Sequence, residues 1–490
     1  MSPLCRRFLR AALAFAASAA PGVSAQGPTP SPPPPAGGEP SSAPLAASAE
    51  AARLSLPEAV TLALERNFGL LASGDAERTA RLRVGVSAAA FHPQLVPRYA
   101  RAENESAFGL ELTQKVPWTG AALSASARYL TTPIGPLGDR ASDVTLRLTQ
   151  PVLRGFGPAT ARFDLRNARR ALQGQERAVV LARQNLMLEV TAAFYQVARQ
   201  RRLVEVARQS QRRGEELRAA SAARMEVGLA SRLDVLRAEL QAAQAGESAV
   251  AAQAALDGAL EQFRLLLGLS PGELVEPVAV ELEAGATAPL EPIEMLIARA
   301  LENRLELQEA RDGVGDAERA RALARQNLLP QLDVGVELAR VGFGSSFSDA
   351  FRRYDQRASV FVSTSYPVER SADRSALASA EIDLGARERG VLERQLTIEG
   401  EVRAAARNLE RIGKSIELQQ RSVELAEQQQ RLANLRYQRG LASNFDVIDA
   451  EGNLVGARTA LVDLLAEQRV AWVQLQRATG SLDLARELEP

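Results

Sequence analysis

Apolar residues recur along most of the chain with the spacing of one helix face. In the stretches 159–225 and 371–438 they step by three and four residues. Such spacing is typical of the seam of a coiled coil. The steps are carried by Leu186, Val190, Ala193 and Val197, and by Val402, Ala405, Leu409, Ile412 and Ile416. Each stretch predicts a helix on the order of 100 Å long, at 1.5 Å per residue.

Shorter stretches alternate apolar and polar residues instead. The clear examples are 108–112, 144–148, 332–338 and 360–364, and 121–130 shows a weaker version. Alternation with a period of two predicts strands with one apolar and one polar face. The segment 342–348, rich in Gly and Ser, reads as a loop between two of these strands.

The chain contains an internal duplication. The segment 227–239 recurs at 439–451, with Gly, Leu, Ala, Ser, Asp, Val, Ala and Glu in the same places, at an offset of 212 residues. Residues 63–67 match 300–304 at an offset of 237. The difference of 25 residues places an insertion in the first copy. Because Gly ends a helix and Ser caps the next one, each copy of the first segment predicts the tip of a helical hairpin.

These signals predict the following organisation. A signal peptide (1–25) and a Pro-rich disordered linker (26–50) precede a first repeat (51–270), with strands at about 94–153 and a tip at 227–231. A linker (271–290) leads to a second repeat (291–482), with strands at about 331–367 and a tip at 439–443, and residues 483–490 form a tail.

Composition excludes several classes of function. Lys plus Arg equals Asp plus Glu, at 59 each, so no basic surface favours nucleic acid. His92 is the only histidine, and one histidine makes neither a zinc cluster nor a Ser-His-Asp triad. The only cysteine, Cys5, falls in the predicted signal peptide. We therefore expect no enzyme, no cofactor and no metal site.

Export without a long apolar helix favours membrane insertion through strands. After the signal peptide no 18 consecutive residues are apolar, as a membrane-spanning helix would require. Strands are viable in lipid only where a barrel closes. The two clear strands of each half are too few, so closure requires several protomers.

Together these features resemble the TolC-like outer-membrane efflux proteins. The resemblance rests on the duplication, on the paired tips, on residues 149–155, on Pro93-Gln and Pro330-Gln, and on the opening Leu54, Leu56, Glu58 and Ala59. It implies a mainly α fold with short β: an elongated α-barrel of coiled-coil hairpins, plus a small transmembrane β-barrel closed by trimerisation. The implied protein is a passive exit duct in the outer membrane of a Gram-negative bacterium. It belongs to a tripartite efflux pump or a type I secretion system and extends into the periplasm.

The resemblance also implies roles for residues at the tips. Asp446 and Asp449 match two aspartates that ring the periplasmic entrance, a role that competes with simple stabilisation of a helix N-terminus. Asp234 and Tyr437 match two members of a gate lock. The arginine of that lock is replaced by Ala442, so Arg232 or Arg439 is the candidate substitute.

The tips imply partners as well. The residues that match the docking surface for a periplasmic adaptor, and indirectly for an inner-membrane transporter, are Val227, Gly228, Leu229, Gly440 and Leu441. The competing hypothesis is a soluble periplasmic coiled-coil adaptor or spacer. The family has two strands per half, so the extra pair at about 108–130 is an extracellular hairpin or barrel wall, and we favour the hairpin. The sequence does not indicate which substrate is exported.

Overall fold

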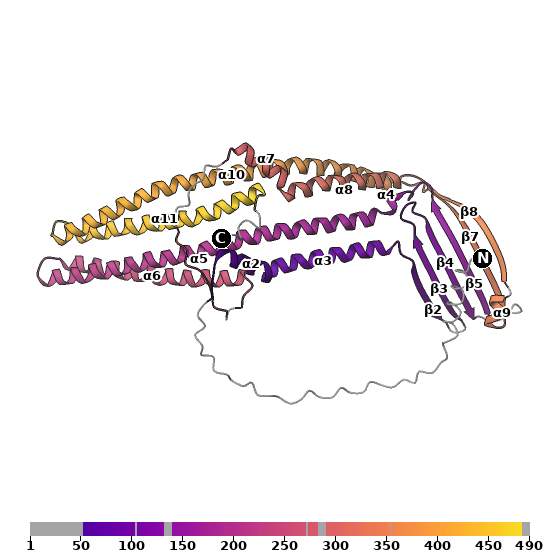
Figure 1. The fold of residues 1–490 in the computed structure, drawn as a ribbon, viewed down its shortest axis with the longest axis horizontal. Coiled ribbons are helices and arrows are strands. Elements are labelled where there is room, and N and C mark those ends of the chain that lie inside the picture. Colours follow the sequence, from indigo (N-terminus) through magenta and orange to yellow (C-terminus); the bar gives the residue numbers. More distant parts are fainter. Residues whose placement is uncertain are drawn as a thin grey trace, which may run out of the picture. The chain divides into compact units, whose positions relative to one another are not determined.

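The computed structural model describes residues 52–102, 105–131, 140–270, 273–282, 291–352 and 354–482, all within the unit Glu50–Pro490. The predictions for residues 1–25, 26–50 and 483–490 lie outside these ranges. The described chain is mainly helical, with one large sheet (Figure 1). No helix in these ranges is both long enough and apolar enough to cross a membrane.

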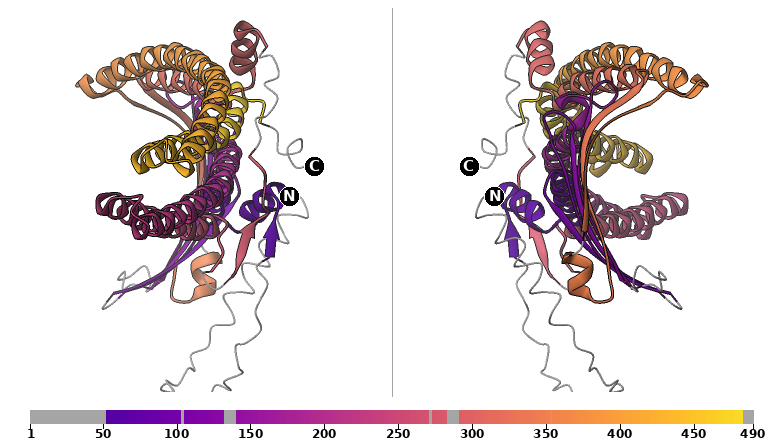
Figure 2. Two further views of the ribbon diagram at one scale, coloured as in Figure 1. Left: turned by 90° about the vertical axis from the view of Figure 1, so that its left-hand side faces the viewer. Right: turned by 90° about the vertical axis from the view of Figure 1, so that its right-hand side faces the viewer.

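Two helical hairpins dominate the structure. The first pairs α5 (Phe163–Glu226) with α6 (Arg232–Leu266), and the second pairs α10 (Ser371–Gln438) with α11 (Asn444–Thr479). Viewed end-on, the hairpins follow one curved layer (Figure 2). The predicted seams form its core: Val190 and Val197 on α5, and Val402 and Ile412 on α10, are all fully buried.

Shorter helices continue the pairing toward the sheet. In the first half these are α2 (Leu56–Arg66), α3 (Phe68–Ala89) and α4 (Pro158–Ala161), and in the second half α7 (Ile293–Asn303) and α8 (Leu305–Asn327). The helix α3 packs on α5, and α8 packs on α10 (Figure 1). Each long helix thus has one partner toward its tip and another toward the sheet.

The sheet has six antiparallel strands in the order β2-β3-β4-β5-β7-β8. Their bounds are β2 Gln94–Arg101, β3 Ser106–Lys115, β4 Ala122–Thr131, β5 Arg140–Pro151, β7 Gln331–Gly344 and β8 Tyr354–Ser365. The extra pair near 108–130, for which an extracellular hairpin was favoured over additional barrel wall, does not stand apart from the sheet. Strands β3 and β4 pair along their whole length with β2 and β5, because all four share one alternation of apolar and polar residues.

The strand register gives the sheet two different faces. One row of the first face joins Leu95, Leu112, Ala125, Leu146, Leu338 and Ala358, and further rows add Val144, Leu148, Val336 and Val360. The opposite face is polar. There Arg98 Nη2 lies 2.7 Å from Glu111 Oε2, and Arg147 Nε donates to Glu337 Oε2 at 2.6 Å.

Two segments differ from their predictions. The predicted loop 342–348 is partly regular, because β7 runs to Gly344 and a short helix, α9 (Phe347–Arg352), follows. Phe347 and Phe351 of that helix both lie against the Tyr129 ring, and this packing of aromatic rings stabilises it. The predicted linker 271–290 contains a strand, β6 (Val275–Pro277), which pairs in parallel with β1 (Ala52–Leu54).

The duplication is visible at the ends of α6 and α11, the second or return helix of each hairpin. In the first half the Asn67 side chain, at the break between α2 and α3, donates to the Leu266 carbonyl oxygen at 2.9 Å. In the second half Arg304, at the break between α7 and α8, donates to the Ala478 carbonyl oxygen at 3.2 Å. These are the pairs expected from the offsets of 237 and 212 residues. Arg304 is also buried between Glu306 and Glu401, each 2.8 Å away.

The joint between the end of α6 and the break between α2 and α3 can be tested at Gly268. It has φ +72°, and a Cβ there would lie 2.5 Å from the Arg66 carbonyl oxygen. Gly268→Ala should cost about 1–3 kcal/mol from backbone strain alone, and more from the clash. The matched control is Gly258→Ala, in the interior of α6 with open space around it, which should stabilise the helix by about 1 kcal/mol. Thermal unfolding of the two variants in detergent is followed by circular dichroism. Equal unfolding temperatures would contradict the close packing of Gly268 at this joint.

Candidate functional site: the hairpin tips

Both hairpin tips turn through the same backbone motif. Gly228 and Gly440 have φ of +76° and +75°, the left-handed region that favours glycine. At the first tip the N–H of Leu229 donates to the Arg224 carbonyl oxygen at 2.7 Å, and at the second the N–H of Leu441 donates to that of Arg436 at 2.8 Å. This arrangement satisfies the last free carbonyls of α5 and α10. It therefore explains why the duplicated sequence keeps a glycine at both places.

Each return helix then begins with a capping box. The Ser231 hydroxyl donates to Asp234 Oδ2 at 2.6 Å, and the Ser443 hydroxyl donates to Asp446 Oδ2 at 2.8 Å. The N–H of each Asp donates back to its serine oxygen. Hydrogen bonds from the serine hydroxyl and backbone N–H lower the pKa of both carboxyls below its usual value. Both aspartates thus have a structural role, whatever else they do.

Asp449 lies one turn further along α11 than Asp446. Its Oδ2 accepts a hydrogen bond from the Asn453 side chain at 3.3 Å. Because residues three apart share a helix face, Asp446 and Asp449 present their carboxylates on the same side of α11. Within one protomer, the two aspartates can therefore face the same opening, as the sequence analysis expected.

Tyr437 joins the two hairpins. Its hydroxyl lies 3.0 Å from Ser221 Oγ on α5, and both side chains are buried. The Arg224 guanidinium, also on α5, lies 4.4 Å from the centre of the Tyr437 ring and donates to the Gln438 carbonyl oxygen at 3.3 Å. The arginine that contacts Tyr437 is thus Arg224.

Further contacts hold the hairpins together above the tips. The Asn444 side chain donates to the Asp234 carbonyl oxygen at 2.7 Å, linking the two return helices. Arg213 Nε lies 2.8 Å from Glu451 Oε2, and Glu451 is almost fully buried. A groove of about 370 Å³ between the hairpins is lined by Arg213, Glu451 and Tyr437 among others. The Asp234 carboxylate, in contrast, stays with Ser231 on its own side.

The extreme ends of the tips are apolar. Val227, Leu229 and Leu441 are 69%, 73% and 72% exposed, and Phe445 beside them is 59% exposed. Singly exposed apolar residues are ordinary, but four at the ends of two adjacent hairpins form a candidate interaction surface. Phe445 was not identified from the sequence, because it replaces Leu233 of the first copy and looks like a core position.

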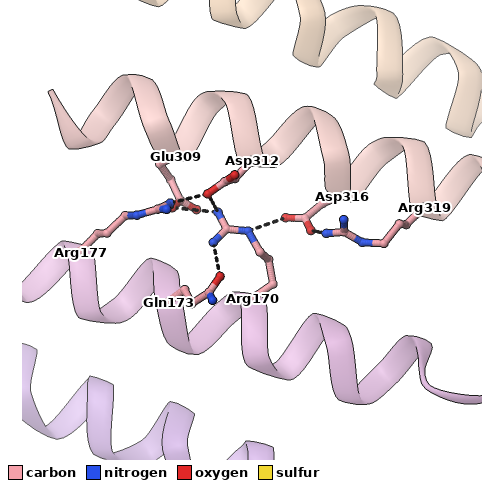
Figure 3. A network of polar contacts seen from close by, with 7 residues as sticks. All are labelled: Arg170, Gln173, Arg177, Glu309, Asp312, Asp316 and Arg319. Atoms are coloured by element: carbon pink, nitrogen blue, oxygen red, sulfur yellow. Dashed lines mark hydrogen bonds and ion pairs between the residues drawn. The ribbon is translucent and has the colours of Figure 1, made fainter. Parts of the chain in front are cut away.

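A charged cluster also ties the two halves together near the sheet. Figure 3 shows Arg170 and Arg177 of α5 facing Glu309, Asp312 and Asp316 of α8. Arg177 Nη1 lies 2.7 Å from both Glu309 Oε2 and Asp312 Oδ2, and Arg170 Nη2 lies 2.8 Å from Asp312 Oδ2. The opposite charges are paired, so the cluster has a structural explanation. Across the described ranges, no group of three or more His, Cys, Asp or Glu is placed to hold a metal ion.

Comparison with known proteins gives this architecture a context. Residues 296–481 match the family model described as outer membrane efflux protein. No curated protein sequence matches the chain. The solved structure of the outer-membrane channel OprN is similar, with a TM-score of 0.69 at 19% identity, over 87% of this chain and 90% of that one.

Two further structures agree. CusC, whose structures describe folding and transmembrane channel formation, has a TM-score of 0.67 at 18% identity, over 90% of this chain and 96% of that one. The outer membrane protein VceC of Vibrio cholerae also has a TM-score of 0.67 at 18% identity, over 87% and 96%. The resemblance found in the sequence is confirmed. Residues 296–481 match the outer membrane efflux protein family, and the described chain has the fold of these solved outer-membrane channels.

Proposed function

We propose that this protein is a passive exit duct of the bacterial outer membrane, in a tripartite efflux pump or a type I secretion system. The observation that carries the proposal is the family match over 296–481, which contains the whole second hairpin and its tip. Three copies assemble so that their sheets lie in the membrane and their helices reach into the periplasm. The duct carries out no reaction and needs no cofactor.

The apolar ends of the tips dock a periplasmic adaptor. Val227, Leu229 and Leu441 are exposed side chains on tight turns whose backbone is fixed by Gly228 and Gly440, and Phe445 is exposed in the first turn of α11. A rigid, apolar end is well suited to a partner that contributes a complementary helical hairpin. The inner-membrane transporter is then reached through that adaptor.

Asp446 and Asp449 form the acidic entrance of the duct. In a trimer they place six carboxylates around the axis, and such rings favour cations. Because the pKa of Asp446 is lowered by Ser443, its carboxylate stays charged in neutral and mildly acidic solution. The same hydrogen bonds stabilise the start of α11, so loss of Asp446 changes both structure and charge.

Tyr437 with Arg224 and Ser221 closes the entrance. These contacts join α10 to α5, that is, one hairpin to the other within a protomer. Opening requires the hairpins to separate at their tips, so the contacts must break. Tyr437 and Asp234 were the lock residues suggested by the resemblance, and we assign the arginine's part to Arg224.

The duct itself is tested by single-channel recording of the purified full-length protein in planar bilayers. We expect cation-selective channels, and we expect the protein to stay with outer membranes after a salt wash. A soluble adaptor or spacer would be released by the wash and would form no channel. That pair of results would overturn the proposed function.

Asp449→Asn tests the acidic entrance without removing a cap. At low salt the ratio of cation to anion permeability should fall by roughly threefold or more, because rings of like charge concentrate counter-ions by ~10-fold or more. The matched control is Asp257→Asn on α6, away from the tips, where an exposed carboxylate likewise accepts a hydrogen bond from a side-chain amide of its own helix, that of Gln253. Unchanged selectivity in Asp449→Asn, in channels of normal conductance, would remove Asp449 from the entrance.

Tyr437→Phe and Arg224→Gln test the closing contact. The first leaves the buried Ser221 hydroxyl without its partner, at a cost of about 1–3 kcal/mol. The second removes a cation–π contact worth about 0.5–2 kcal/mol. Both should raise the open probability of the channel in bilayers, and the double variant should raise it most. Arg232→Gln is the control at the same tip. If it opens the channel as much as Arg224→Gln does, the lock is assigned to the wrong arginine.

A further inference from the structure

The six-stranded sheet has two long edges without partners in the described chain. Strand β2 forms one edge over 8 residues and β8 forms the other over 12. Every side chain of β2 is exposed, and so is every side chain of β8 except Phe361. In a membrane, an unpaired row of backbone N–H and C=O groups costs several kcal/mol per group, so both edges need a partner.

The two edges suit each other in direction. Strand β2 leads away from α3, whereas β8 leads back to α10 (Figure 1). Since the helices lie at one end of the sheet, β2 and β8 run in opposite senses. They can therefore form an antiparallel pair, which would continue the pattern of all five existing pairs.

The two edges also match in the character of their faces. On the apolar face, Leu95 of β2 and Ala358 of β8 are the two ends of one row that crosses the whole sheet. On the polar face, Arg98 of β2 and Arg357 of β8 are held by carboxylates, from Glu111 and Asp355. A strand that joins either edge must place its apolar and polar side chains on the same faces as this sheet and at the same level in the membrane. The edge strand of a second copy meets both requirements, because it has the same sequence.

The partner of each edge is not the other edge of the same chain. Closing a barrel on itself takes about eight strands before the interior has room even for its own side chains. Six strands are fewer than that, and the polar face carries long arginines such as Arg98, Arg128 and Arg147. The occupant must therefore be a second copy of the chain.

We propose that β8 of one copy pairs with β2 of the next, so that three sheets of six strands close an 18-stranded barrel. The inference rests on the trimer of the proposed function and adds its strand count. The two additional strands per copy are β3 and β4, which occupy the region of the 25-residue insertion in the first repeat. Barrels of about 16–18 strands enclose an aqueous channel.

Disulfide cross-linking of the full-length protein in outer membranes tests the pairing. Val96 of β2 and Ser359 of β8 both lie on the polar face. The double variant Val96→Cys/Ser359→Cys, with Ser363→Cys and Asp355→Cys as alternatives to cover the register, should give dimers and trimers on non-reducing gels. The native Cys5 is replaced by Ser, and each variant is first recorded in bilayers to establish that it forms channels.

The matched control moves the first cysteine to β4. Ser126 lies in the same row of the polar face as Val96. If two strands of each sheet were left out of the barrel wall, they would have to be β2 and β3 at the free edge, and β4 would then be the strand that pairs with β8 of the next copy. Cross-linking through Ser126→Cys/Ser359→Cys would therefore mean a barrel of 12 strands and would overturn the proposal. So would a product that stays monomeric, or no product from any β2–β8 pair in channel-forming protein. Absence of channels in every variant and in the parent protein would instead count against the proposed function.

Discussion

The structure depends on giving each long helix a packing partner along its whole length. A helix of 64 residues such as α5 is stable only where its narrow apolar seam is covered. The return helix α6 covers the seam toward the tip, and α2 and α3 cover it toward the sheet. The change of partner occurs at the joint where Asn67 meets Leu266, and Arg304 meets Ala478 in the second half. The close approach at Gly268 follows from this need to bring two helix ends together without leaving a gap in the seam.

Because of the duplication, the two tips share one backbone conformation but differ in the side chains that surround it. Gly228 and Gly440, with the capping aspartates Asp234 and Asp446, repeat the same geometry. The asymmetry lies in what surrounds them: Tyr437 projects from the second hairpin into the first. A shared scaffold therefore allows one hairpin to supply the closing side chain and the other its binding site, as a gate between the hairpins would require.

Much of this could be predicted from the sequence, and the failures have a common cause. Periodicity alone locates the long helices and five of the six strands, because each has one apolar face. Strand β2 was not singled out within the predicted strand region 94–153, because Pro97 and the apolar Val96 on its polar side obscure its alternation. The place of β3 and β4 within the sheet, and the contact of Arg224 with Tyr437, depend on pairing between segments far apart in the chain. Nothing local distinguishes Arg224 from the many other arginines of α5, so only the packed structure identifies it.

In the proposed duct, the distribution of paired charge indicates where ions would be discriminated. On the polar face of the sheet two arginines are matched by carboxylates across neighbouring strands, Arg98 by Glu111 and Arg147 by Glu337. The opposite charges of each pair largely cancel, and salt screens what remains beyond about 8 Å at physiological ionic strength, so these pairs exert little net field on a passing ion. At the tip the hydrogen-bond partner of Asp449, Asn453, is neutral and leaves the carboxylate charge uncancelled. If the sheet lines a wide exit and the tips a narrow entrance, charge selection belongs to the entrance, because a narrow opening brings every ion within one screening length of the ring.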